Sequence, residues 1–269
     1  MIPLRATQAA IALAVLLPAP AGASSSDVYR TEGGALRLVT TGLAGPDGTL
    51  RGAIEIALEP GWKTYWREPG SSGVPPQIDV SKSLNVSGAE LHFPAPEWHE
   101  DSYGAWAGYG GSVTLPVTFS IPAPDRYSLI EADLFLGICE DICVPVHATL
   151  SVEPGSDPDN LLDRQFVDAA FARLPAPAGE DFGIVGADVS DDAVTIEAVL
   201  PANAADAQLF VAGSDGYVFG LPHRTEMAPG KAAFELPVMA KPKDGDGAAS
   251  IAYTLVAGGK AASGEFQLP

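Results

Sequence analysis

The chain has 269 residues, and its 34 acidic against 15 basic side chains give a formal net charge of −19 at pH 7. Such an acidic surface repels phosphate backbones and anionic lipid headgroups, which excludes nucleic acid and anionic membranes as expected partners. The length suffices for two domains of ordinary size. The 29 Gly and 24 Pro residues, together with few helix-period segments, favour an all-β fold.

The N-terminus has the pattern of an export signal. Arg5 precedes an apolar run over residues 9–17, and Ala21-Gly22-Ala23 supplies small residues for cleavage. This pattern predicts a secretory signal peptide over residues 1–23, too short to stay as a membrane-spanning helix. No later run reaches the ~18 apolar residues that a span needs, so we expect an exported chain without stable membrane insertion.

Short segments with period-2 alternation follow the signal peptide, and each is bounded by turn residues. They predict strands over residues 35–43, 50–58, 62–66, 84–93, 113–121, 130–138 and 144–152. A long loop is expected over 68–76, and 98–111 is expected to be irregular. Strands and turns over ~120 residues are typical of an immunoglobulin-like β-sandwich, which we assign to residues 24–153.

The rest of the chain predicts a helix and then a second set of strands. Residues 154–178 are expected to be a linker with one helix over 158–174, capped by Asp157 and starting at Pro158. Alternation then predicts strands over 183–188, 193–200, 207–213, 232–238 and 249–257. We therefore expect residues 179–269 to form a second, smaller β-sandwich, which contains no Cys and no Trp.

The chain has two cysteines, Cys139 and Cys143, and they lie at the tip of a predicted hairpin. Partners across an antiparallel pair lie ~4.5–5.5 Å apart at Cα, within reach of a disulfide. The pair can be a redox-active dithiol or a structural disulfide. A disulfide closing a loop of ~5 residues stabilises by only about 2 kcal/mol. Composition leaves both interpretations open.

A metal site is a further alternative, because Cys139, Cys143 and His147 are spaced four residues apart. On a hairpin, His147 lies ~13 Å along the strand from Cys143, too far for shared coordination. We therefore expect no metal and no other cofactor.

The residues between the cysteines bear on their reactivity. Glu140 and Asp141 place negative charge beside both sulfurs, and no helix N-terminus is predicted there to offset it. Negative charge disfavours a thiolate, so we expect a partner's reactive cysteine to start the exchange.

Three segments resemble the periplasmic N-terminal domain of the DsbD family of thiol–disulfide interchange proteins: Pro94-Ala95-Pro96-Glu97-Trp98-His99-Glu100-Asp101-Ser102-Tyr103-Gly104, then Val113-Thr114-Leu115-Pro116-Val117, then residues 139–145. The run over 60–70, with Gly73 and Pro75-Pro76, is similar to the ScsB branch of that family. The resemblance covers roughly residues 30–153.

The resemblance implies an immunoglobulin-like domain whose cysteines cycle between dithiol and disulfide. Carried over by position, Cys139 and Cys143 are the redox pair, Asp101, Ser102, Tyr103 and Gly104 form a cap loop with Tyr103 as its covering aromatic, and Tyr65 lines the site. An aromatic lid would exclude solvent and small thiols until a partner displaces it. The cap run is one residue shorter than the family pattern.

The resemblance further implies a thiol–disulfide oxidoreductase of the periplasm. It would relay electrons from a membrane-embedded thiol reductant to thioredoxin-fold proteins. The sequence shows neither membrane helices nor a thioredoxin domain, so we expect the donor to be a separate CcdA- or DsbD-like protein. Two alternatives remain open: a β-sandwich binding or scaffold protein with a structural disulfide, and a copper or zinc metallochaperone.

Overall fold

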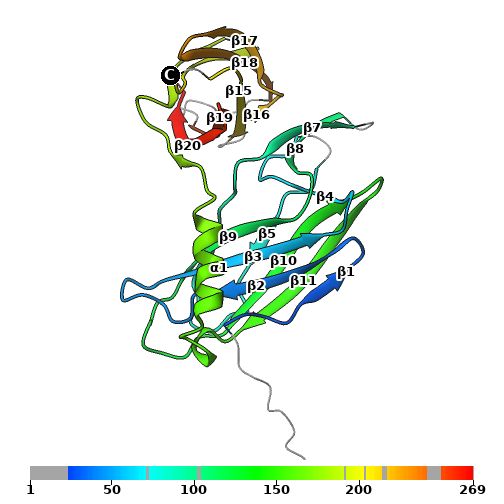
Figure 1. Cartoon of the computed structure of the whole chain (residues 1–269), viewed down its shortest axis with the longest axis vertical. Coiled ribbons are helices and arrows are strands. Elements are labelled where there is room, and N and C mark those ends of the chain that lie inside the picture. Colours follow the sequence, from blue (N-terminus) through cyan, green and yellow to red (C-terminus); the bar gives the residue numbers. More distant parts are fainter. Residues whose placement is uncertain are drawn as a thin grey trace, which may run out of the picture.

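The computed structural model describes residues 24–70, 73–101, 104–190, 192–202, 204–213, 217–240 and 250–268. The predicted signal peptide, residues 1–23, lies outside this range. The described chain is an all-β protein with two β-sandwiches, one after the other, and one α-helix between them (Figure 1). Among the described residues, no helix is long and apolar enough to cross a membrane.

Two sheets pack face to face in the N-terminal sandwich. The first has the strand order β1-β2-β3-β9-β6, and the second has the order β11-β10-β4-β8-β7 with β5 paired to β10. Their bounds are β1 Tyr29–Thr31, β2 Gly34–Thr40, β3 Thr49–Leu58, β4 Lys63–Tyr65, β5 Gln77–Asp79, β6 Gly88–Leu91, β7 Glu97–Asp101, β8 Gly104–Tyr109, β9 Val113–Ser120, β10 Ile130–Cys139 and β11 Cys143–Val152.

The C-terminal sandwich also has two sheets, with the orders β12-β20-β19-β15 and β13-β14-β18-β16, and β17 pairs with β18. Their bounds are β12 Ala176–Pro177, β13 Gly183–Val189, β14 Ala193–Val199, β15 Ala207–Gly213, β16 Val218–Phe219, β17 His223–Ala228, β18 Lys231–Ala240, β19 Ser250–Ala257 and β20 Lys260–Gln267. Each sandwich has its own apolar core.

The β10–β11 hairpin pairs without interruption from Ile130 opposite Val152 to Cys139 opposite Cys143. Alternate residues on both strands, Ile138 and Val146 among them, are buried in the core between the two sheets. Because successive side chains of a strand point to opposite faces, the intervening residues face outward. Both cysteines belong to this outward set.

Three sequence-based expectations need correction. The segment over 98–111, expected to be irregular, forms most of the β7–β8 hairpin. The helix is shorter than 158–174. It spans α1 Leu161–Phe171, because the Asn160 side chain accepts hydrogen bonds from the amides of Leu162 and Asp163 and so caps it there. The C-terminal sandwich also contains β12, β16, β17 and β20, which alternation did not predict.

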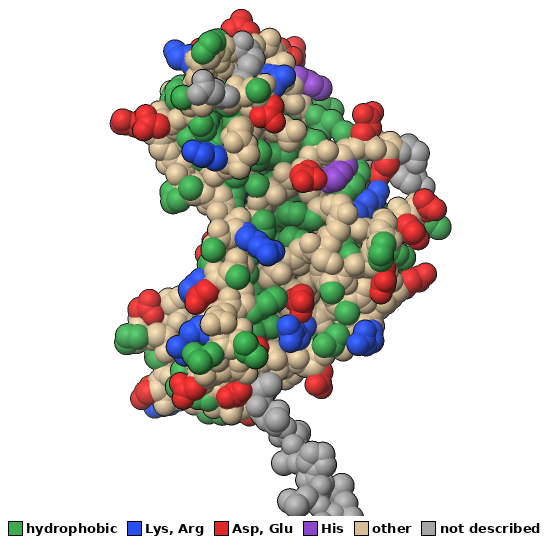
Figure 2. Space-filling view, in the orientation of Figure 1, with side chains coloured by type: hydrophobic (Ala, Val, Ile, Leu, Met, Phe, Trp, Pro, Cys, Tyr) green, Lys and Arg blue, Asp and Glu red, His purple; other side chains and the backbone are tan. Residues whose placement is uncertain are grey.

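Helix α1 covers the outer face of the first sheet and leads to the second sandwich (Figure 1). Val167 and Ala170 pack on Val39 of β2 and Ala53 of β3. The space-filling view shows acidic side chains spread over both sandwiches on the visible face (Figure 2).

An aromatic contact joins the two sandwiches. Phe210 of β15 is fully buried and stacks on Trp98 of β7, with ring centroids 5.0 Å apart and an interplanar angle of 16°. Trp66, which follows β4, meets the same ring edge-on at 6.0 Å. The indole N–H of Trp98 donates to the carbonyl of Leu209 at 3.4 Å. The second sandwich therefore contacts the first beside β4 and the β7–β8 hairpin.

We expect Phe210→Ala to destabilise the protein by about 3 kcal/mol, because truncating a buried phenylalanine removes its apolar contacts and leaves a cavity. In a chain of this size the melting temperature should fall by roughly 5–10 °C. Thermal unfolding followed by circular dichroism measures the change. Val189→Ala, at an exposed position on β13, is the matched control. Equal melting temperatures for the two variants would show that the aromatic contact contributes nothing to the stability of the folded protein.

Candidate redox site

A disulfide joins Cys139 and Cys143 at the end of the β10–β11 hairpin, with an S–S distance of 2.13 Å and a Cα–Cα distance of 4.1 Å. The two residues are direct partners in the antiparallel register. The bond lies on the outer face of the second sheet, away from the sandwich core. Cys139 is 1% exposed, whereas Cys143 is exposed. Cys143 is therefore the more accessible of the two cysteines to an incoming thiolate.

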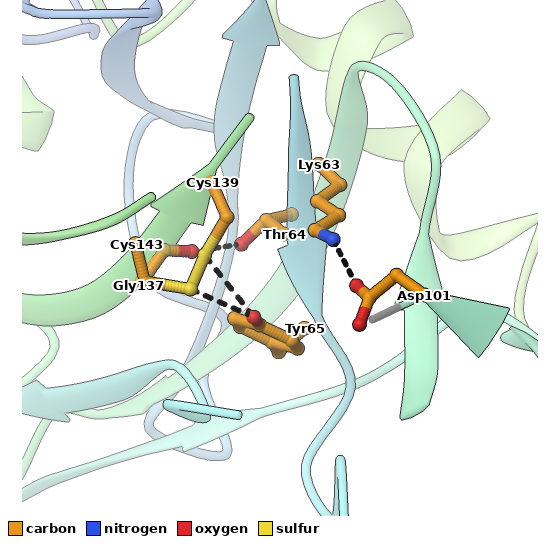
Figure 3. Close-up of a disulfide and its surroundings, with 7 residues drawn as sticks. All are labelled: Lys63, Thr64, Tyr65, Asp101, Gly137, Cys139 and Cys143. Carbon is orange, nitrogen blue, oxygen red and sulfur yellow. Dashed lines mark hydrogen bonds and ion pairs between the residues drawn. A yellow bond between two sulfur atoms is a disulfide. The ribbon is translucent and has the colours of Figure 1, made fainter. Parts of the chain in front are cut away.

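Tyr65 of β4 contacts both sulfurs (Figure 3). Its hydroxyl oxygen lies 3.1 Å from Cys139 Sγ and 3.0 Å from Cys143 Sγ. A disulfide sulfur carries no hydrogen, so the phenol is the donor. Burial, and secondarily the negative charge of Asp101, raise the pKa of Tyr65. The ring therefore keeps its proton at neutral pH and presents an O–H group to the sulfurs.

Gly137 lets this ring reach the disulfide. A Cβ atom at Gly137 would lie 3.2 Å from Cε2 of Tyr65 and 3.0 Å from Cβ of Val74. Thr64, adjacent to Tyr65, donates its hydroxyl to the Gly137 carbonyl at 2.9 Å and holds β4 against β10. The absence of a side chain at position 137 thus creates the space that the phenol ring fills.

A cavity of about 240 Å³ opens beside the disulfide. Its lining consists of Lys63, Tyr65, Asp101, Trp106, Cys139, Glu140, Asp141, Ile142 and Cys143. Trp106 of β8 packs edge-on against Tyr65 at 5.6 Å, and the two rings cover Cys139. On the open side, Ile142 is 77% exposed. The site therefore has an aromatic wall on one side and an exposed turn on the other.

An ion pair bridges the cavity. Lys63 Nζ lies 2.5 Å from Oδ2 of Asp101 (Figure 3). The same nitrogen lies 4.7 Å from the centroid of the Trp106 ring. Strand β8 lies between β4 and β7 in the sheet, so the ion pair crosses over it. The contact ties the last residue of β7 to β4.

The structure brings together four of the residues expected at the site: Tyr65, Asp101, Cys139 and Cys143. Gly104 is absent from this lining and instead borders a cleft between the two sandwiches. Ser102 and Tyr103 lie outside the described residues, so the covering role of Tyr103 stays a prediction.

Sequence reasoning did not identify Lys63, Trp106 or Gly137 as site residues. A signal for Lys63 was present, because residues two apart on a strand share a face and Tyr65 was already placed at the site. Gly137 and Trp106 depend on how β4, β8 and β10 align, which the sequence does not reveal.

No metal site is evident among the described residues: none of their His, Cys, Asp and Glu side chains form a group of three or more suited to holding an ion. The ring of His147 stacks on Phe135, its partner across the hairpin, with centroids 4.4 Å apart. This contact gives His147 a packing role on the outer face of the sheet.

A comparison with protein-family models finds a match to the segment that contains the disulfide. Residues 37–153 match the family model described as the N-terminal part of the thiol:disulfide interchange protein DsbD. No curated protein matches the chain.

One solved structure extends the likeness to both sandwiches. The N-terminal periplasmic domain of ScsB from Proteus mirabilis superposes with a TM-score of 0.75 at 19% identity, covering 92% of this chain and 99% of that one. At this identity the likeness concerns the fold. The C-terminal domain of the AgI/II polypeptide BspA from Streptococcus agalactiae gives a TM-score of only 0.19 at 10% identity, over 91% of this chain and 98% of that one.

The matched segment contains the disulfide, Tyr65 and the β7–β8 hairpin. Residues 37–153 of this chain are thus similar to the N-terminal domain of the thiol:disulfide interchange protein DsbD.

Proposed function

We propose that this protein is a periplasmic thiol–disulfide relay. It takes electrons from a membrane-embedded thiol reductant of the CcdA or DsbD type and passes them to thioredoxin-fold proteins. The observation that carries the proposal is the phenol of Tyr65, held against both sulfurs of a disulfide with one exposed and one buried partner. A structural disulfide has no need of a buried donor aimed at its sulfurs.

The order of the exchange steps follows from which of the two cysteines is accessible. A donor thiolate attacks Cys143 Sγ, and the bond to Cys139 breaks with its electron pair remaining on Cys139 Sγ. The donor's second thiolate then attacks its own sulfur in the mixed disulfide, which releases Cys143 as a thiolate. The donor is oxidised to its disulfide, and the chain gains two electrons, with protons taken from solvent.

Delivery reverses these steps. The Cys143 thiolate attacks a disulfide of the thioredoxin-fold acceptor and forms a mixed disulfide. Cys139 then attacks Cys143 Sγ, restores the internal bond and leaves the acceptor as a dithiol. In the first half of the cycle Tyr65 can donate its O–H to the developing Cys139 thiolate, and a hydrogen bond to an ionised group is stronger than one to a neutral sulfur.

A first test combines reduction potential and trapping. We expect the Cys139–Cys143 couple to have a reversible potential in the range of catalytic pairs, roughly −120 to −270 mV. In the native cell, Cys139→Ala should accumulate a mixed disulfide through the exposed Cys143, and Cys143→Ala should accumulate less. A potential below about −300 mV, with no adduct from either variant, would favour the scaffold alternative.

A second test removes the hydrogen-bond donor of Tyr65, its hydroxyl group. Tyr65→Phe should slow reduction of the disulfide by a dithiol protein such as a reduced thioredoxin about tenfold or more, since a hydrogen bond to a charged group contributes about 1.5–3 kcal/mol. Stopped-flow measurement of the reduction rate gives the change. Tyr127→Phe, at an exposed tyrosine, is the control. Equal rates for both variants would exclude a role for the Tyr65 hydroxyl.

A third test closes the space beside the ring. Gly137→Ala should displace the Tyr65 ring and slow reduction of the disulfide by the dithiol protein. In a Tyr65→Phe background, the same substitution should cause little further slowing. Gly88→Ala on β6 is the matched control, because a Cβ there meets no atom within 4 Å. If the two substitutions slow the reaction independently, Gly137 acts by a route other than the phenol.

A further inference from the structure

Lys63 is the direct cross-strand partner of Cys139. The β4–β10 register places Cys139 opposite Lys63, and such partners have Cβ atoms ~4.5–5.5 Å apart on the same face of the sheet. The Lys63 side chain is 16% exposed, so its charge lies within the site rather than in solvent. The ammonium of Lys63 thus pairs with Asp101, while the backbone register places the side chain of Lys63 beside that of Cys139.

The charges around the disulfide are otherwise negative or neutral. The hairpin turn contributes Glu140 and Asp141, β7 contributes Asp101, and Tyr65 on β4 is a neutral phenol. Among the described residues that line the cavity, Lys63 is the only basic one. When the disulfide opens, a further negative charge develops on Cys139, and Lys63 is the cation placed to meet it.

We propose that Lys63 is the electrostatic partner of the Cys139 thiolate, and that its ammonium is shared between Asp101 in the disulfide form and the sulfur in the reduced form. The inference rests on the relay function and deepens it. In the step where a donor thiolate attacks Cys143, the electron pair of the S–S bond moves to Cys139 Sγ. Lys63 stabilises that charge without transferring a proton.

This assignment changes the expected reactivity. Considered alone, Glu140 and Asp141 predict a weakly acidic thiol. A cation within ~4–6 Å lowers the pKa of a thiol and makes it a better leaving group in the exchange. Because Asp101 competes for the same ammonium, the cation becomes available to Cys139 only as that sulfur gains its charge.

The test isolates the Cys139 thiol. In a Cys143→Ala background it is the one remaining cysteine, and the ultraviolet absorbance of its thiolate is followed against pH. We expect Lys63→Met to raise the pKa of this thiol by about one unit, which lowers the thiolate fraction near neutral pH about tenfold. Lys63→Arg should restore the pKa of the parent.

Lys82→Met is the matched control. Lys82 also pairs with a carboxylate of the first sandwich, Asp133 at 2.7 Å, but it is 71% exposed and does not line the cavity. This variant removes the same unit of charge and should leave the thiol pKa unchanged. Melting temperatures of all variants establish that each is folded.

An unchanged thiol pKa in a folded Lys63→Met variant would overturn the inference. So would an equal rise in Lys63→Arg, which would indicate a packing role. Either result would leave the relay intact, provided that the parent protein still forms mixed disulfides and has a potential in the catalytic range. A parent disulfide that no dithiol protein reduces would instead remove the proposed function, whatever the Lys63 variants show.

Discussion

Burial of one face of the β10–β11 hairpin decides where the two sulfurs point. Ile138 and its alternate neighbours are buried in the sandwich core, so Cys139 must face the opposite side of the sheet. The register then places Cys143 beside it. A shift of one residue on either strand would turn that cysteine into the core and separate the pair. The apolar core therefore sets the geometry of the redox site, although none of its side chains touches a sulfur.

Strand β4 and the residue that follows it join the site to the second sandwich through three consecutive residues. Thr64 bonds to the carbonyl of Gly137, Tyr65 contacts the sulfurs, and Trp66 packs on Phe210. On β7, Trp98 stacks on the same Phe210 ring three residues before Asp101. The second sandwich thus packs, from outside the site, on two segments that contribute residues to it.

The electrostatics of the site are compatible with the proposed exchange, in which the disulfide opens. The neutral disulfide lies beside carboxylates without penalty, whereas a thiolate in the same place would be repelled by them. A phenol whose pKa is raised by burial keeps its proton and can donate it in a hydrogen bond. The ammonium of Lys63 already lies in the site, paired with Asp101. The oxidised structure therefore holds the groups that a reduced state would need.

The sequence by itself determined the fold class, the cysteine hairpin and the resemblance of residues 37–153 to the DsbD N-terminal domain. Alternation around Cys139 and Cys143 reports directly which face is buried, and the Gly- and Pro-bounded strands indicate β-sandwiches. It did not reveal the β7–β8 hairpin, because Gly and aromatic residues there do not alternate cleanly. It also missed β20, where Ala, Ser and Gly carry little hydrophobic signal.

Only the tertiary structure placed Lys63 opposite Cys139. It also brought the Tyr65 ring against Gly137, where no side chain blocks it. The stacking of Trp98 on Phe210 likewise depends on how the two sandwiches pack. These contacts join strands that are far apart in the chain, and their register depends on how whole sheets pack. Local sequence patterns carry no record of that packing.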